Sequence, residues 1–134
     1  MHLRALFGIS KIVTNDTGIF SLNSEKTLSL GSGIVVSSDG YILTNEHVSG
    51  GKYSKCYVTT QESKEEYSGT VVWADSDIDL SIIKIEKLGM TEAVLGDSDK
   101  IRIGKQVFAI GNPIGKDFER TVTARNCKCS RQDD

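Results

Sequence analysis

The fold is decided by one stretch, Gly33-Ile34-Val35-Val36-Ser37-Ser38-Asp39-Gly40-Tyr41-Ile42-Leu43-Thr44. Two runs of β-branched, aromatic and other apolar residues lie on either side of Asp-Gly, a dipeptide that is typical of tight hairpin turns. The stretch therefore predicts a β-hairpin.

Similar short runs follow along the chain, each bounded by glycine, aspartate, serine or asparagine. They predict strands over residues 56–60, 67–74, 80–85, 106–110 and 120–124. Directly after the hairpin, residues 44–51 begin with helix-capping residue types and end in glycines, which predicts one helical turn. No segment has the sustained period of a long amphipathic helix. The predicted class is all-β, an antiparallel sandwich or barrel.

Composition narrows the class of protein further. The 134 residues suffice for one domain, and 38% hydrophobic with 25% charged residues is typical of a globular protein. The net charge is -2, and no basic cluster is interleaved with aromatic residues, so nucleic-acid binding is not predicted. No apolar run approaches the ~18 residues of a membrane span, and no signal segment is predicted.

The three cysteines, Cys56, Cys127 and Cys129, do not form the even, spaced set of a disulfide framework, so free thiols are expected. A zinc site that combined them with His47 would lack the usual paired Cys-x-x-Cys spacing. No metal site is predicted from the cysteines.

A calcium loop is the rival interpretation for a group of nearby carboxylates. Asp75, Asp77 and Asp79 alternate, and Glu86 stands at the twelfth position of such a loop. The sixth position, which requires glycine for its sharp turn, is Leu80. Solvated turn carboxylates are therefore expected at Asp75 and Asp77, and no metal or cofactor is predicted.

His47 gains meaning only from its context, because a lone histidine is usually structural or exposed. Three segments in order resemble the HtrA/Deg type of trypsin-like serine protease. They are Gly31 to Val36 with Asp39-Gly40-Tyr41-Ile42-Leu43-Thr44-Asn45-Glu46-His47-Val48, then Asp77-Ile78-Asp79-Leu80-Ser81-Ile82-Ile83-Lys84-Ile85, then Leu95-Gly96-Asp97-Ser98-Asp99 running on to Ala109-Ile110-Gly111-Asn112-Pro113-Ile114-Gly115.

The resemblance assigns catalytic roles to two residues. His47 corresponds to the general base, and Asp79 to the carboxylate that orients it. The resemblance also implies the N-terminal β-barrel of a chymotrypsin/trypsin-like fold, with a second barrel that supplies the serine nucleophile, the oxyanion hole and the specificity pocket. The family presents its serine in Gly-Asn-Ser-Gly-Gly, and this string is absent here. We therefore expect a serine endopeptidase fragment that is inactive by itself.

Further properties come with the resemblance alone. Family members act on peptides or unfolded proteins, often assemble as trimers, and work outside the cytoplasm or attached to a membrane. The rival interpretation is a non-catalytic β-barrel module that binds a peptide or a partner protein. The sequence does not indicate the cleavage specificity or a downstream PDZ module.

The end of the chain departs from the family pattern. Residues 1–124 are expected to form the N-terminal barrel. Residues 125–134 form a polar tail that lacks the alternation of apolar and polar residues expected of a strand. Codons for Arg125 to Ser130, read one base later, can encode Gly-Ile-Val-Ser-Ala, a strand with which a family member would continue. We hypothesise a single extra base after the Ala124 codon; the alternative is a genuine short protein with a polar tail.

Two structural expectations follow. His47 and Asp79 should lie at the same edge of the sheet, bonded or one rotamer change from bonding, with the carboxylate at the proton-bearing ring nitrogen. The face that would meet a second barrel should be exposed and partly apolar, which favours self-association.

Overall fold

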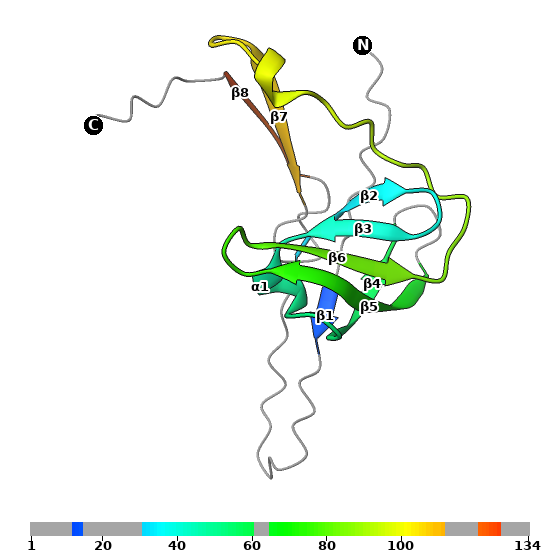
Figure 1. Cartoon of the computed structure of the whole chain (residues 1–134). Coiled ribbons are helices and arrows are strands. Elements are labelled where there is room, and N and C mark those ends of the chain that lie inside the picture. Colours follow the sequence, from blue (N-terminus) through cyan, green and yellow to red (C-terminus); the bar gives the residue numbers. More distant parts are fainter. Residues whose placement is uncertain (1–11, 15–30, 61–64, 112–120, 127–134) are drawn as a thin grey trace.

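A computed structural model of the chain describes residues 12–14, 31–60, 65–111 and 121–126. Most of these residues belong to a six-stranded antiparallel sheet with the order β1-β4-β5-β6-β3-β2 (Figure 1). Its strands are β1 (Ile12–Thr14), β2 (Ile34–Ser37), β3 (Tyr41–Thr44), β4 (Lys55–Thr59), β5 (Glu66–Asp75) and β6 (Leu80–Ile85).

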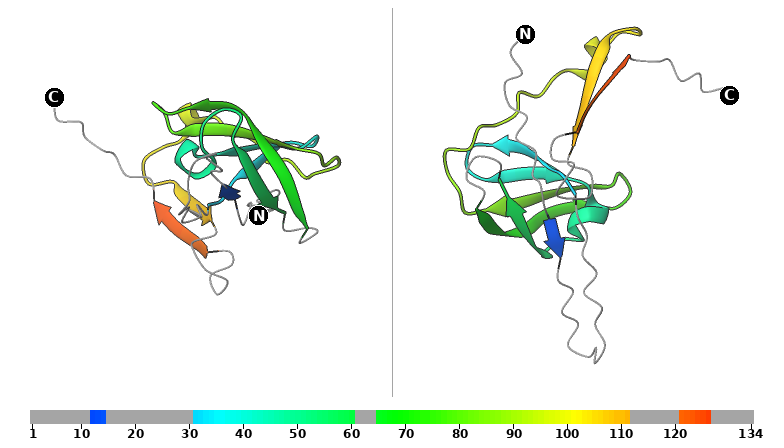
Figure 2. Two further views of the ribbon diagram at one scale, coloured as in Figure 1. Left: turned by 90° about the horizontal axis from the view of Figure 1, so that it is seen from below. Right: turned by 180° about the vertical axis from the view of Figure 1, so that it is seen from behind.

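A second sheet consists of β7 (Gln106–Gly111) and β8 (Thr121–Asn126), which pair antiparallel. Figures 1 and 2 show this hairpin beside the larger sheet. Among the described residues, the helical elements are the single turn α1 (Glu46–Ser49) and a short 3-10 turn, η1 (Ser98–Lys100). Within the described ranges, neither helical element has the length or apolar character needed to cross a membrane.

The predicted all-β antiparallel class is confirmed, and every predicted strand is present to within about two residues. The short strand β1 was not predicted, because three β-branched residues are too few for a clear period. The strand β8 runs through Arg125 and Asn126, so the prediction that these two residues lack strand structure is wrong. The remaining tail lies outside the described residues, and the division at residue 124 stays a prediction.

Closure into a barrel also stays a prediction. In the described part of the chain the outer strands of the large sheet, β1 and β2, do not pair with each other. The register shifts in the β2–β3 and β5–β6 pairs, between Val35 and Ser37 and between Val71 and Trp73. Such bulges increase local twist and bend a sheet.

The core lies on one face of the large sheet, where alternate residues of β3, β4 and β6 are buried. Its buried members are Val35, Ile42, Val48, Cys56, Val58, Val71, Ile83, Ile85 and Met90. Burial raises the pKa of the Cys56 thiol to about 11, which suits a structural thiol rather than a nucleophile.

The predicted hairpin turn depends on Gly40. Its φ of +98° lies in the region that side chains disfavour, and its N–H donates to the Ser37 carbonyl at 3.2 Å. A Cβ at this position would lie 2.2 Å from the carbonyl oxygen of Ile85. The turn between β2 and β3 therefore packs directly against the end of β6.

Candidate active site

The site arises where two neighbouring strands begin and end. The strands β3 and β6 run antiparallel with Thr44 opposite Ser81. The chain leaves β3 at Asn45 to enter α1, and it enters β6 from Asp79. Residues more than thirty positions apart in the sequence consequently meet at one edge of the sheet.

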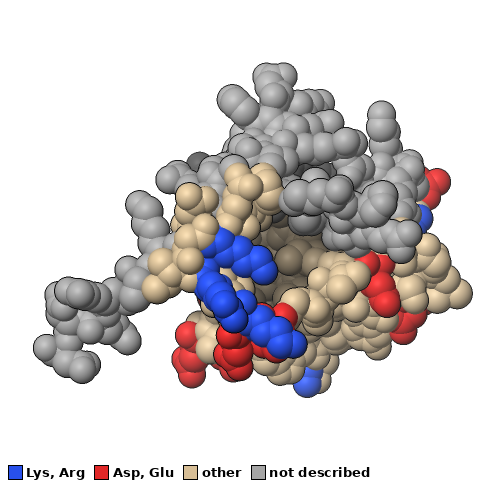
Figure 3. All heavy atoms as spheres, turned by 90° about the horizontal axis from the view of Figure 1, so that it is seen from above, with Lys and Arg blue, Asp and Glu red and all other residues tan. Residues whose placement is uncertain are grey.

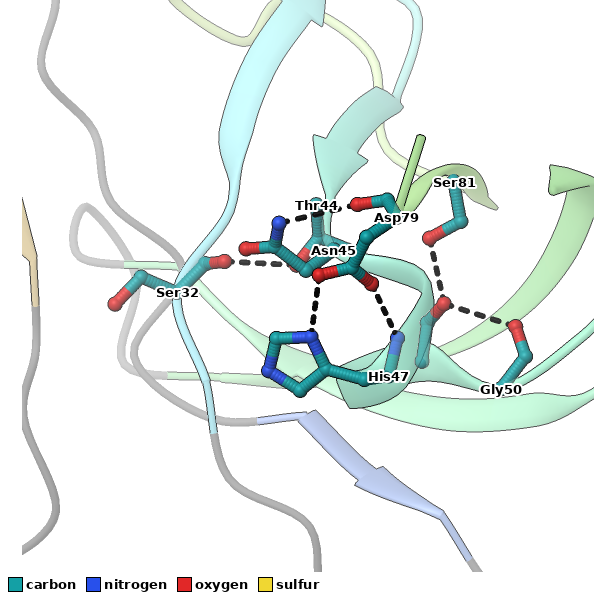
Figure 4. Close-up of polar contacts among 8 residues, drawn as sticks. Ser32, Thr44, Asn45, His47, Gly50, Asp79 and Ser81 are labelled. Carbon is teal, nitrogen blue, oxygen red and sulfur yellow. Dashed lines mark hydrogen bonds and ion pairs between the residues drawn. The ribbon is translucent and has the colours of Figure 1, made fainter. Parts of the chain in front are cut away.

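His47 and Asp79 are in direct contact at this edge (Figure 4). The ring Nδ1 of His47 lies 2.6 Å from Oδ2 of Asp79, and the backbone N–H of His47 donates to Oδ1 at 2.9 Å. The expected neighbourhood of these two side chains is confirmed. A single carboxylate fixes both the main chain and the ring of the histidine.

The protonation of the pair follows from the state of the carboxylate. The backbone N–H of His47, followed by its side chain, holds the pKa of Asp79 below its ordinary value of 3.8. At neutral pH the carboxylate only accepts hydrogen bonds, so Nδ1 carries the proton. In the neutral ring, Nε2 then has the free lone pair. Figure 4 shows Nε2 directed away from Asp79.

Asp79 itself adopts a left-handed backbone with φ of +53°. Aspartate and asparagine tolerate this conformation better than most residues with side chains. The Asn45 side chain donates from Nδ2 to the Asp79 carbonyl at 3.1 Å and so supports the unusual peptide. Asn45 stands at the N-cap of α1, but its side chain makes no capping hydrogen bond. This role was not predicted, because only the fold brings Asn45 beside Asp79.

A buried hydroxyl pair lies just inside the site. Ser49 Oγ is 2.6 Å from Ser81 Oγ, and both serines are completely buried. The sequence analysis missed this contact. A signal existed in β6, where Ser81 shares the buried register of Ile83 and Ile85 and is the polar member of an apolar alternation.

The Gly31-Ser32-Gly33 segment lies beside the site, directly before β2. The hydroxyl of Thr44 donates to the Ser32 carbonyl at 2.8 Å. A Cβ on Gly31 would lie 2.4 Å from Cγ1 of Val48. Glycine at position 31 therefore allows close packing against α1.

The carboxylates that were weighed as a calcium loop form a turn instead. The backbone N–H of Asp77 donates to Oδ1 of Asp75 at 2.9 Å, the pattern of an aspartate turn. Asp79 is engaged with His47. Across the ranges that the structure describes, no three histidine, cysteine, aspartate or glutamate side chains gather as metal ligands.

Comparison with known proteins places this geometry in a family. Residues 31–133 match the model of the trypsin-like peptidase domain. The HtrA-type protease AlgW, solved with a tripeptide, superposes with a TM-score of 0.75 at 31% identity over 94% of this chain and 38% of AlgW. A serine endoprotease from Yersinia pestis gives a TM-score of 0.67 at 30% identity, over 90% of this chain and 40% of that one.

The chain belongs to the HtrA-type trypsin-like peptidases. The HtrA-type domain is similar in sequence to the magnetosome formation protease MamE of Magnetospirillum gryphiswaldense, at 44% identity over 92 residues. It is 43% identical over 96 residues to a protein of Marinomonas sp. named as a DegP-like periplasmic serine endoprotease. These matches cover 66% and 72% of the chain but only 12% and 20% of the two relatives.

The predicted HtrA/Deg resemblance is thus confirmed. The chain spans a fifth or less of the length of these curated relatives. The catalytic roles of His47 and Asp79 in the HtrA-type domain stay predictions at this point.

Proposed function

We propose that His47 and Asp79 are the general base and the orienting carboxylate of a serine-type endopeptidase. The observation that carries the proposal is the 2.6 Å contact between Nδ1 of His47 and Oδ2 of Asp79, with 68% of the histidine side chain exposed. A base must be held in one tautomer and must also be reachable by the group that it deprotonates. His47 meets both requirements.

The chemistry runs from the carboxylate outward. Asp79 accepts the Nδ1 proton and stabilises the positive charge that His47 acquires when Nε2 takes a proton. A serine hydroxyl is a weak nucleophile until such a base removes its proton during attack on a peptide carbonyl. The exposed side of the ring is where this hydroxyl has to approach.

We infer that the serine and the oxyanion hole are not supplied by these 134 residues. The family's Gly-Asn-Ser-Gly-Gly string does not occur in the sequence. Loss of a triad serine costs on the order of a millionfold in turnover. The 134-residue polypeptide by itself is therefore proposed to be inactive.

The substrate class and the compartment are carried over from relatives. AlgW was solved with a tripeptide, and the Marinomonas relative is named as periplasmic. We propose that the complete protease acts on peptide or unfolded protein segments outside the cytoplasm. Self-association or trimer formation through this domain belongs to the same proposal.

A chimera tests the catalytic assignment. In it, the aligned region of this chain replaces the corresponding region of the Marinomonas relative, which supplies the serine half. We expect hydrolysis of an unfolded protein substrate and labelling by a fluorophosphonate serine probe. Both should be lost in the His47→Ala chimera, whereas the 134-residue polypeptide alone should show neither.

Circular dichroism provides the control, because it shows whether the chimera is folded. A folded chimera without hydrolysis would refute the catalytic role and favour a peptide-binding module. Hydrolysis by the 134-residue polypeptide that disappears on His47→Ala would refute its proposed inactivity.

A further inference from the structure

Two hydrogen bonds join α1 to the segment that enters and begins β6. His47 bonds to Asp79, and two residues further along each segment Ser49 bonds to Ser81. Both contacts join residues that are 32 positions apart. The first contact is exposed to solvent, whereas the second is completely buried.

The direction of the buried contact can be assigned. A serine hydroxyl has one hydrogen to donate, and a carbonyl oxygen can only accept. Ser49 Oγ lies 3.1 Å from the carbonyl oxygen of Gly50, to which it donates. Ser81 must therefore donate to Ser49, which gives a chain of hydrogen bonds from β6 through Ser49 to Gly50, the residue that follows α1.

The helix α1 needs such ties because it is only four residues long. One helical turn is not stable in isolation, since nucleation fixes several residues for few hydrogen bonds. The Asp79 carboxylate holds the start of α1 through the His47 N–H, at 2.9 Å. The buried serine pair holds its end. Together with the Asn45–Asp79 bond and the buried Val48 side chain, they hold α1 against β6.

We propose that Ser49 and Ser81 are positioning residues that keep the His47 ring in register with the Asp79 carboxylate. The hydrogen bonds of these two serines go to each other and to Gly50 rather than to the ring or the carboxylate, so both act through the placement of α1. The inference rests on the proposed function, because it assigns these hydroxyls a role in holding a catalytic pair. The experiment below reads the placement itself and needs no hydrolysis.

The test uses the complete 134-residue chain and two NMR signals of His47. One is the hydrogen-exchange rate of its backbone amide, which reports the bond to Asp79. The other is the low-field resonance of the Nδ1 proton, which reports the ring contact. The chain has two histidines, His2 and His47, so the substitution His2→Asn leaves His47 as the single histidine to observe.

The informative variant is Ser49→Ala combined with Ser81→Ala. Removing both hydroxyls avoids leaving one of them buried without a partner, so the fold should survive. We expect amide exchange of His47 to accelerate about tenfold through local opening of α1, with loss of the Nδ1 proton resonance. Ser81→Ala alone keeps the bond from Ser49 to Gly50. It should shift both His47 signals in the same direction, and it tests the proposal if the double variant does not fold.

Thr44→Val is the matched control. It removes a part-buried hydroxyl bond close to the site that does not join α1 to β6. We expect both His47 signals to stay as in the parent. Parental signals in the serine variants, or equal changes in Thr44→Val, would overturn the proposal. A folded chimera without hydrolysis would instead refute the proposed function and leave these signals as they are.

Discussion

Asp79 accepts two hydrogen bonds from the single residue His47, one from the backbone N–H at 2.9 Å and one from the ring at 2.6 Å. The carboxylate is therefore more than an electrostatic partner of the imidazole. It also fixes where α1 begins. A change at Asp79 should accordingly affect the tautomer of the ring and the stability of the fold.

The tautomer can be tested with Asp79→Asn. Asparagine tolerates the left-handed backbone at this position, so the change mainly removes the charge and one acceptor. The side-chain amide would donate where Oδ2 accepts, and we expect the His47 proton to move from Nδ1 to Nε2. Nitrogen-15 shifts of the ring measure this change, which would abolish base function at Nε2.

Asp77→Asn is the control for this variant, since it makes the same charge change two residues away in the same turn. It should leave the His47 tautomer unchanged. A ring that keeps its proton on Nδ1 in Asp79→Asn would contradict the assigned hydrogen-bond directions.

Acid stability gives a second prediction. The folded-state pKa of Asp79 lies below its ordinary value of 3.8, so the folded protein binds its proton less readily than the unfolded chain does. The corresponding stabilisation is fully present above about pH 4 and is lost as the pH falls through the folded pKa. Urea unfolding of parent and Asp79→Asn between pH 2 and 6 should therefore show curves that converge in acid. A constant difference across this range would argue against the shift.

The hairpin turn gives a third prediction, on stability alone. Gly40→Ala should lower the free energy of unfolding by about 3 kcal/mol or more, because left-handed strain adds to a collision with the main chain. The new Cβ would lie 2.2 Å from the Ile85 carbonyl oxygen. Denaturant unfolding measures the loss.

Gly89→Ala separates the two causes. Gly89 has φ of +72°, yet nothing lies within 4 Å of its Cβ position. Strain alone should cost about 1 kcal/mol there. Equal losses in the two variants would show that the contact with Ile85 is unimportant.

The segment between β6 and β7 leads to a fourth prediction. Val94, Leu95 and Ile103 have 82%, 72% and 72% of their surfaces exposed. On the face seen in Figure 3, basic side chains lie next to acidic ones, and Lys100 Nζ is 3.3 Å from the Asp97 carboxylate. With little net charge to oppose contact, the exposed apolar groups should promote self-association.

Sedimentation velocity over a range of concentrations measures this association. The triple variant Val94→Ser, Leu95→Ser and Ile103→Ser should shift the chain toward monomer. Tyr53→Ser, at a residue that is 73% exposed outside this segment, is the control and should have little effect. A parent chain that stays monomeric at high concentration would refute the prediction.

The sequence was sufficient for most strands, because alternation and Asp-Gly are local signals that survive in the fold, but it missed the three-residue β1 and the end of β8. It was also sufficient for the pairing of His47 with Asp79, although only through the resemblance, since local sequence does not bring them together. Asn45 shows the limit. Its residue type favours a helix cap, but the approach of β6 offers its amide the Asp79 carbonyl instead. The Ser49–Ser81 contact likewise depends on the register between α1 and β6, which no local pattern specifies.

The equal spacing of the two α1–β6 contacts restricts how the chain can change in length. Residues 50–78 connect the two pairs of contacting residues along the chain and include β4 and β5. Neither contact requires this connection to have a fixed number of residues. Insertions at a turn within it lengthen the excursion through β4 and β5 without altering the site. If one residue is deleted between positions 47 and 49, or between 79 and 81, the His47–Asp79 and Ser49–Ser81 contacts can no longer form at the same time. Natural insertions and deletions in this domain should therefore be found within residues 50–78 and be absent from residues 47–49 and 79–81.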